Sequence, residues 1–339
     1  TNTSNVYGIE KINGEPVSPP ATLPPERVGF NDFPLDEDGF VRRALLGALP
    51  PMQVQDPDRF RFAFPLILAK AYLAEAGFIL ENGRRDPRNM QFGDTELFAV
   101  RSHSGAYVNA NASGVQILIN VRSGQTPFQT VSMTDVLTDQ VEADLIRDRI
   151  VIIGITSLSA KDLVNSAAVN TVNPGLFYGV EMHAHITSQI VSAVLDNRPL
   201  LRVWTDPWEY LWIVMWGGMG MLLVRFIPRP ALHMLSVGVI SLGLLGFSLV
   251  LLWAGGWWIP VMPTLVAFTV NGLILPAFYL YDQTLRSRIA ERQRVIEETY
   301  DSIHNGPLQT LALLLRQKAT LAPEVSTQLI NLNQELREV

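Results

Sequence analysis

The sequence predicts a multi-domain membrane protein with a mixed α/β extracytoplasmic domain, three transmembrane α-helices and a C-terminal α-helical hairpin. Three observations lead to this prediction. Residues 1–207 interleave short β-branched runs with amphipathic helical runs, residues 208–281 are almost continuously apolar, and residues 282–339 are charged and helix-forming. Such uneven hydrophobicity is typical of a chain with parts inside and outside a bilayer.

Composition excludes several classes of function. The net charge of -6 and the lack of a Lys/Arg-rich stripe give no reason to expect a nucleic-acid partner. With no cysteine in 339 residues, disulfides, Cys-based zinc sites and cysteine nucleophiles are excluded. The chain starts at Thr1 without an initiator Met or a signal-like segment, so we expect it to be a piece of a longer protein.

The apolar region divides into three predicted spans, residues 208–227, 231–254 and 257–281. Each reaches the roughly 20 residues that a helix needs to cross the hydrocarbon core. The alternative is a buried helical hairpin in a large soluble protein. Three such segments in succession leave no polar face for water, which favours the membrane, and the lipid bilayer is then a partner of the chain.

The loops between the spans predict the orientation. Basic residues lie between spans one and two and again after span three, whereas the turn between spans two and three is uncharged. The positive-inside rule therefore places the C-terminus in the cytoplasm and residues 1–207 outside, in a multi-pass inner or plasma membrane protein. We expect Asn271 to make a helix-helix hydrogen bond and three prolines to bend span three. These prolines are Pro260, Pro263 and Pro276.

The domain before the membrane has the pattern of a mixed α/β fold. Residues 115–121 and 149–154 are short, β-branched and apolar, as buried strands are. Residues 60–77 and 180–195 predict helices, and the second of these carries an apolar stripe. That stripe is formed by Met182, Ile186, Ile190 and Val194. We expect residues 1–26, polar and proline-rich, to form an irregular arm ahead of a domain over residues 27–207.

These residues carry a resemblance to a known family. The run from Phe30 to Arg43 resembles the opening signature of CHASE2 domains. Residues 150–154, Lys161-Asp162, Gly175 and residues 179–184 resemble the closing one. The resemblance covers about residues 27–200 and includes the three-span tail usual for that family. It implies an extracytoplasmic sensor of bacterial signalling proteins whose ligand is generally undefined, normally preceded by an N-terminal membrane anchor.

Several side chains of this domain have a functional and a plain interpretation. His183 and His185 could hold a metal, but on a helix they lie on different faces, which favours a packing histidine beside a surface one. Residues 36–39 are acidic but lack the spaced ligands of a calcium loop, which favours a solvated turn, so no metal site is predicted. Arg42, Arg43, Lys161 and Asp162 could line a ligand pocket. The G-x-S-x-G spacing of a hydrolase elbow is absent after residue 153.

The charged C-terminal region predicts two helices that dimerise. A 4/3-spaced seam runs from Leu285 to Ile303, with polar residues at Arg292 and Thr299, and a second such run covers residues 325–339. Such a seam fits a parallel dimer that continues out of the membrane. Because the linker over residues 319–323 is short, we expect an antiparallel hairpin and, from two copies, a four-helix bundle. The chain is thus its own predicted partner.

A histidine follows the last residue of the first seam. His304 lies at the bundle surface, and a neutral imidazole is a nucleophile toward phosphoryl groups. The run from His304 to Gln309 resembles the phosphoacceptor box of two-component sensor histidine kinases. The resemblance implies His304 as phosphoacceptor, Gln309 as the residue that positions water for dephosphorylation, and a response regulator as partner. Asn305 stands where that box usually has an acid, and an amide cannot act as a general base.

We therefore expect the sensor and dimerisation portion of a protein histidine kinase. The resemblance implies ATP with Mg²⁺ for a catalytic domain that this chain lacks, and no cofactor in the chain itself. The alternatives are a non-enzymatic receptor or scaffold, which Asn305 favours, and the same sensor with another output domain, such as a cyclase or a Ser/Thr kinase.

Overall fold

The computed structural model describes the chain in two compact units. The first unit comprises Thr1–Met215 with Val239–Leu265, and the second comprises Trp216–Gly238 with Val266–Val339. The described residues are 3, 5–50, 59–124, 126–157, 159, 162–166, 176–227, 229–303, 309–316 and 322–338.

Small sheets form the β part of the first unit. A three-stranded antiparallel sheet has the order β4-β3-β8, from Arg61–Phe62, Arg43–Ala48 and Val115–Leu118. A second antiparallel sheet joins β5 (Leu80–Asn82), β6 (Met90–Phe92) and β7 (Thr95–Leu97). Three two-stranded sheets complete the set among the described residues. They are β1 (Gly8–Glu10) with β2 (Val28–Phe30), β9 (Leu163–Asn165) with β10 (Leu176–Tyr178), and β11 (Arg202–Val203) with β12 (Trp257–Trp258).

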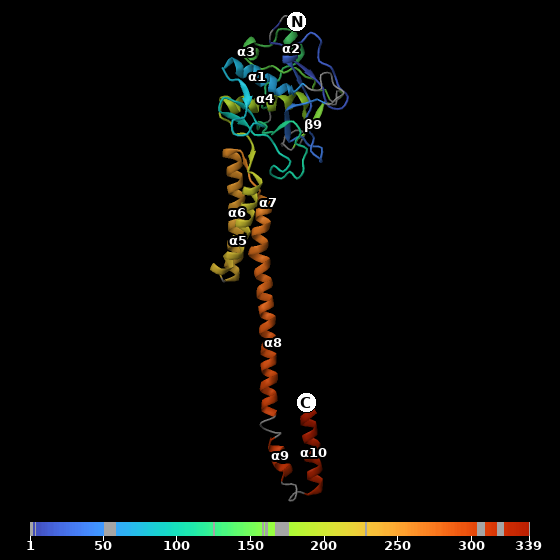
Figure 1. Cartoon of the computed structure of the whole chain (residues 1–339), viewed down its shortest axis with the longest axis vertical. Helices are drawn as coiled ribbons and strands as arrows, with labels where there is room; N and C mark the ends of the chain where they lie inside the picture. The colour runs from blue at the N-terminus through green and yellow to red at the C-terminus, as the bar shows by residue number, and fades with distance from the viewer. Residues whose placement is uncertain are drawn as a thin grey trace. The chain divides into compact units, whose positions relative to one another are not determined.

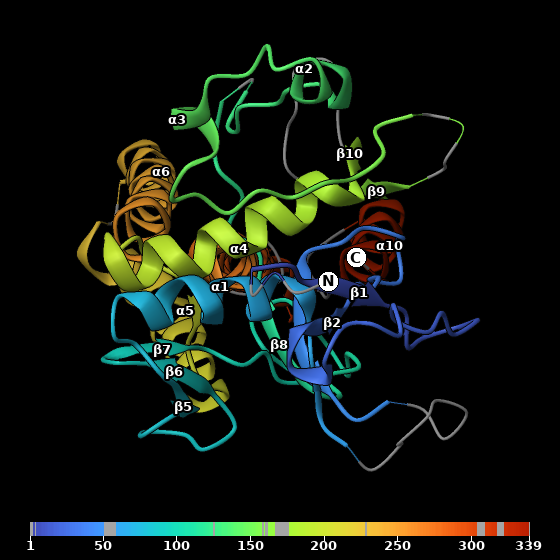
Figure 2. The same ribbon diagram turned by 90° about the horizontal axis from the view of Figure 1, so that it is seen from above.

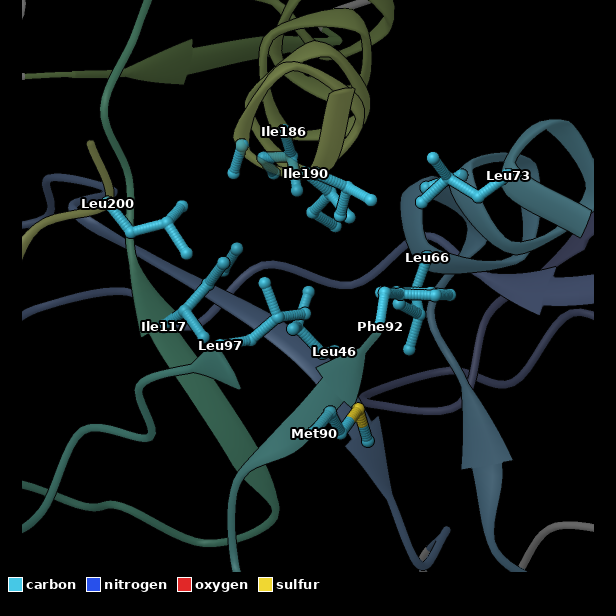
Figure 3. Close-up of a cluster of buried hydrophobic side chains, with 14 of the residues drawn as sticks. Leu46, Leu66, Leu73, Met90, Phe92, Leu97, Ile117, Ile186, Ile190 and Leu200 are labelled. Carbon is cyan, nitrogen blue, oxygen red and sulfur yellow. The ribbon is translucent and has the colours of Figure 1, made fainter. Parts of the chain in front are cut away.

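Two helices pack side by side over these strands (Figure 2). They are α1, Phe64–Glu75, and α4, Gly179–Leu195, so both predicted helices of the domain are confirmed within a few residues. The predicted stripe of α4 is buried, with Met182 and Ile190 fully enclosed. It meets Leu66 and Leu73 of α1 and apolar side chains of β3, β6, β7 and β8 in one core (Figure 3). The shorter helices are η1 (Pro25–Arg27), α2 (Met133–Leu137) and α3 (Ala143–Ile146).

The predicted strand over residues 149–154 is wrong. The segment forms no strand, and Val151 and Ile153 are 54% and 77% exposed. The edge of β8 that does not pair with β3 is the edge where such a strand would pair, and other groups already bond to it. The Val100 amide donates to the Gln116 carbonyl at 2.7 Å, and the Gln189 side chain bonds the Leu118 carbonyl and the Asn120 amide at 2.9 and 2.7 Å. Composition predicts a preference for burial but not which edge is open.

The N-terminal segment is more ordered than its polar composition indicates. β1 runs parallel to β2, and Ile12 is buried beside Phe30 in a second apolar cluster. The buried carboxylate of Glu10 pairs with Arg61. The first 26 residues therefore contribute a strand and core side chains to the unit.

Among the described residues, two helices are long and apolar enough to cross a membrane, Pro230–Gly255 (α6) and Val261–Asp301. The second comprises α7 (Val261–Thr269), a π-helical turn (Val270–Ile274) and all but the last two residues of α8 (Leu275–Ile303). The first predicted span forms α5, Asp206–Phe226, in which Trp and Gly residues lower the hydropathy. Three spans therefore remain a prediction. The third begins later than expected, because Trp257 and Trp258 form β12 instead of a helical turn.

Polar contacts of the second unit join these helices. The Asn271 side chain donates to the Gly217 carbonyl at 3.2 Å, which confirms the expected helix-helix hydrogen bond. His233 is buried, and its Nε2 lies 2.5 Å from the Gly272 carbonyl. Pro276 has no N–H to donate to that carbonyl four residues earlier, so the histidine takes the place of the missing helical donor. The π turn lies where Pro276 interrupts the regular ladder.

The chain ends in two further helices of the second unit. α9, Gln309–Arg316, and α10, Pro323–Glu338, pack against one another (Figure 1). Leu311 of α9 is buried. A packed helix pair is thus present, while its assembly into a dimeric bundle remains a prediction.

Candidate functional site

The structure describes the residues on both sides of the histidine box but not every residue of the box itself. α8 ends at Ile303 and α9 begins at Gln309, while His304 and Asn305 lie outside the described residues. Gln309 is exposed at the first position of its helix. The box therefore begins directly after the last residue of α8 and ends at the first residue of α9.

The seam of α8 is uncovered in the single chain. Leu285, Ile289 and Ile296 are 41%, 57% and 66% exposed. Ion pairs Arg286–Asp282 and Arg294–Glu298, four residues apart, lie on the same helix. Exposed apolar side chains at heptad spacing are those that a second helix would cover.

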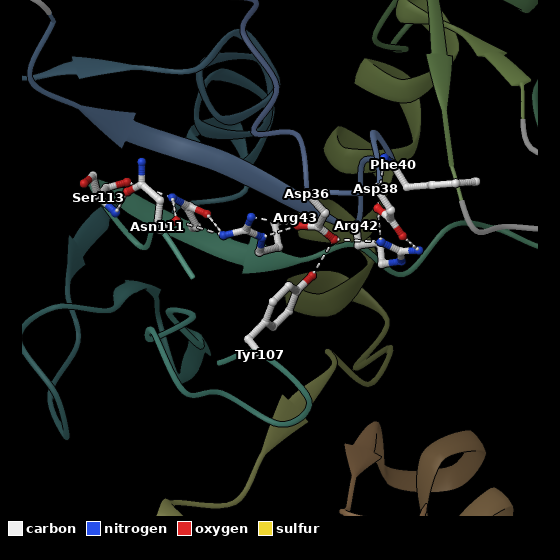
Figure 4. Close-up of polar contacts among 9 residues, drawn as sticks. Asp36, Asp38, Phe40, Arg42, Arg43, Tyr107, Asn111 and Ser113 are labelled. Atoms are coloured by element: carbon white, nitrogen blue, oxygen red, sulfur yellow. Dashed lines mark hydrogen bonds and ion pairs between the residues drawn. The ribbon is translucent and has the colours of Figure 1, made fainter. Parts of the chain in front are cut away.

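In the first unit, a buried ion pair organises the start of β3 (Figure 4). The Arg43 guanidinium, 4% exposed, donates to Asp36 Oδ1 through Nε at 2.9 Å and Nη2 at 2.7 Å. Its Nη1 donates to the Gln116 side chain and the Asn111 carbonyl, both at 2.9 Å. The Tyr107 hydroxyl donates to the other oxygen of Asp36 at 2.9 Å. A buried charge needs such complete pairing, because each unpaired group would keep its desolvation cost.

Arg43 also lines a cavity of about 620 Å³, here called the Arg43 cavity. Gln116 and Asn111 line it beside apolar side chains of Phe33, Leu45 and Phe60. Of the four residues expected at a pocket, Arg43 is therefore placed there. Arg42 instead pairs with Asp36 and Asp38 nearer the surface, Asp162 lies against Gly179 at the start of α4, and Lys161 lies outside the described residues.

A second cavity, of about 960 Å³, shares Phe60 and Gly114 with the first and is here called the Lys70 cavity. Its lining combines apolar residues of β4, β6 and β8 with three cations, Lys70, Arg88 and Arg101. Sequence reasoning missed these cations. They lie on α1 and in two separate loops, and only the fold brings them together.

The two histidines of α4 are both buried. His183 is 8% exposed and packs against Phe33 with ring centroids 4.6 Å apart, which confirms its packing role. His185 is 1% exposed, so the expectation that one of the pair lies at the surface is wrong. Its Nδ1 accepts from the Arg122 amide at 3.1 Å, and Phe128 and Phe177 contact its ring. The pKa of each ring is lowered to about 4, by burial for His183 and by burial together with the charges of Arg198 and Arg122 for His185.

The acidic turn is held by arginines. Asp36 and Asp38 pair with Arg42 and Arg43, and the Gly39 amide donates to the Asp36 carbonyl at 2.9 Å. Their oxygens are therefore committed to guanidinium groups. No group of three or more metal-ligating side chains occurs within the part of the chain that the structure describes.

A small parallel sheet joins the domain to the apolar helices within the first unit. β11 follows α4 and pairs with β12, the two residues that connect α6 to α7. The Arg202 guanidinium lies 3.9 Å from the centre of the Trp257 ring. The Tyr107 ring meets Trp258 edge-on at 6.3 Å. One side chain, Tyr107, thus contacts both the Asp36 ion pair and the residue pair that precedes α7.

The chain thus has a mixed α/β domain with a buried ion-pair network and two cavities, followed by apolar helices. The CHASE2 domain family model matches residues 2–222, and the chain belongs to this family of extracellular sensor domains. The match extends beyond the expected domain at both ends, into the N-terminal segment and into α5. No curated protein and no solved structure matches the chain.

Proposed function

We propose that this chain is the sensor and dimerisation portion of a transmembrane histidine kinase. The observation that carries the proposal is the order of its parts. A CHASE2 sensor precedes the apolar helices, and α8 then runs without interruption to Ile303, directly before the histidine box. A continuous helix transmits a displacement or rotation along its length.

The proposed input route begins at the Arg43 network. A ligand that repositions Asp36 would move Tyr107, whose ring lies against Trp258. Two residues separate Trp258 from the start of α7, and α7 leads through the π turn into α8. Such a ligand acts only through a difference in its affinity for the two arrangements.

The proposed output is the phosphorylation state of His304. The neutral imidazole attacks the γ-phosphorus of ATP, the bond to the β,γ-bridging oxygen breaks, and ADP leaves. A separate catalytic domain supplies the ATP and Mg²⁺. The proton released from the ring passes to water, because the amide of Asn305 cannot accept it, whereas Gln309 retains the amide needed to hold a water. The balance between the two activities should therefore favour dephosphorylation of the response regulator.

Phosphate labelling tests the proposal in the full-length protein that carries this chain. With radiolabelled ATP, acid-labile phosphate should appear in the natural protein and vanish in His304→Ala. The matched control is His103→Ala, a substitution of an exposed histidine in the sensor domain. Undiminished acid-labile phosphate in His304→Ala contradicts the assignment.

The same experiment distinguishes a histidine kinase from the alternative functions. Asn305 favours a receptor that dimerises or docks a partner without phosphoryl transfer, or a CHASE2 sensor that feeds another output domain. If neither the natural protein nor Asn305→Glu carries acid-labile phosphate, the receptor alternative replaces the kinase.

A further inference from the structure

We propose that the Lys70 cavity is a binding site for a small organic anion with an apolar body, such as an aromatic carboxylate. The inference deepens the receptor role proposed above and rests on it, but it does not depend on the chemistry of His304. It follows from the lining of the cavity and from the pairing of its charged groups.

The apolar part of the lining, here called the floor of the cavity, comes mostly from β-strands. Phe62, Met90 and Val115 come from three strands, β4, β6 and β8, and Leu80 and Val100 extend the same surface. Met90 belongs to the domain core and is 6% exposed. At about 960 Å³ the cavity has the size of sites for organic molecules, larger than an inorganic anion needs.

Two arginines at the cavity share one carboxylate. Arg88 reaches Asp86 through Nε at 3.1 Å and Nη2 at 3.3 Å, and Arg101 pairs with the same carboxylate through Nη2. These contacts hold the pKa of Asp86 at about 2, so it stays ionised. Each guanidinium keeps N–H groups that have no partner among the described residues, and the two are half to two-thirds exposed. Both therefore retain donors for a ligand.

Lys70 is the third cation and has no carboxylate within ion-pair distance in the described part of the chain. Its Nζ lies 5.8 Å from the centre of the Phe62 ring, at the border between the charged rim and the apolar floor. The lining itself holds three cations and one acid, Glu81, while the carboxylates of Asp86 and Glu96 lie beside it and accept hydrogen bonds from Arg88, Arg101 and Asn89. The excess of positive charge selects an anion, and forked guanidinium donors suit a carboxylate.

The apolar floor and the cationic rim together define the ligand class. A rigid aromatic ring covers Phe62 and Met90, while its carboxylate reaches the cations at the edge. An inorganic anion would leave the floor uncovered, and a neutral aromatic would leave the cations unpaired. We use 2-naphthoate as the probe and 2-naphthamide as its neutral match.

The test measures binding to the whole chain in lipid nanodiscs by calorimetry, with empty nanodiscs as the reference for partitioning. We expect 2-naphthoate to bind at least about tenfold more tightly than 2-naphthamide, and Arg88→Gln and Lys70→Met each to weaken 2-naphthoate by about five- to tenfold. Arg84→Gln is the matched control. Arg84 is 66% exposed, pairs with Asp94 at 3.4 Å and belongs to the same loop as Arg88. The Arg84→Gln variant should bind 2-naphthoate with the affinity of the natural chain.

Several outcomes overturn the inference. They are equal affinity for the acid and the amide, equal loss in Arg84→Gln and Arg88→Gln, or no binding of 2-naphthoate or the smaller benzoate at millimolar concentration. Unchanged thermal unfolding of Arg88→Gln confirms that a loss of binding is not a loss of fold. If 2-naphthoate binds but His304 carries no phosphate, the binding-site inference stands and the kinase proposal fails.

Discussion

The Tyr107 ring lies edge-on against Trp258, with ring centroids 6.3 Å apart. Its hydroxyl donates to Asp36, 71 residues earlier in the chain, and the Arg43 guanidinium lies 4.8 Å from its ring centre. Burial and the bond to Asp36 raise the pKa of Tyr107 to about 12, so the hydroxyl keeps its proton. One side chain therefore joins the ion pair at β3 to the residues that precede α7.

Substitution of this side chain separates its two contacts. Tyr107→Phe keeps the ring against Trp258 but removes the donor to Asp36, and should destabilise the domain by about 1–2 kcal/mol. Trp258→Ala removes the ring contact and keeps the hydrogen bond. Thermal unfolding of both variants and of the double variant should give additive losses if the contacts act independently. A Tyr107→Phe variant as stable as the natural chain contradicts the hydrogen bond.

The neighbouring arginines of β3 should differ sharply in their effect on stability. Arg43→Met leaves the buried Asp36 carboxylate without its main partner and should cost about 3–5 kcal/mol in the free energy of unfolding. Arg42→Met removes a side chain that is 36% exposed and should cost at most about 1 kcal/mol. Denaturant unfolding measures both. Similar losses in the free energy of unfolding for the two variants would show that the buried Arg43 ion pair does not stabilise the domain more than the exposed Arg42 pair does.

The buried histidines predict acid sensitivity. Both rings have a folded pKa of about 4, below the ordinary value of 6.5, so the folded state holds them neutral. Above pH 6.5 both states are neutral and stability is complete. As the pH falls from 6.5 toward 4, the unfolded chain binds protons that the folded chain does not, and stability decreases by up to roughly 3 kcal/mol per ring.

Unfolding measured across this pH range checks the acid sensitivity. His183→Phe, which fits between Phe33 and Phe64, should flatten the slope, because one titrating ring is removed. His103→Gln, at an exposed position, serves as control. A slope of the opposite sign contradicts neutral burial of the rings.

His233 and Pro276 should show a strong dependence on one another. His233→Phe leaves the Gly272 carbonyl without its donor and should cost about 1 kcal/mol in detergent-mediated unfolding. In Pro276→Ala the restored N–H can satisfy that carbonyl, so the same histidine substitution should cost clearly less. Equal costs in the two backgrounds would mean that His233 does not substitute for the helical donor.

The sequence predicts the helices of the domain better than its strands. α4 follows from apolar periodicity, which is a local signal. Residues 149–154 have the composition of a strand, yet the Gln189 side chain, from α4, occupies the edge of β8 that they would need. Pairing depends on residues far along the chain, and composition does not encode it.

The candidate sites show the same contrast. The acidic turn and the arginines beside it are visible in the sequence, and Arg43 lies where a pocket was expected. Tyr107 and Gln116 join them only because β3 and β8 are neighbours, and no local pattern distinguishes them. His185 is buried because Phe128 and Phe177 enclose the helix face that spacing alone assigns to the surface.

The π turn at Val270–Ile274 gives the helix that continues into α8 a point at which its rotation about its own axis can change. A π turn accommodates one surplus residue, so its conversion to regular α-helix would swing every later side chain by about 100° around the axis and advance it by about 1.5 Å. Leu285 and Ile289 would then face a new direction while the helix stayed intact. We therefore expect movement of α8 to be mainly a rotation about its axis, with only a small shift along it.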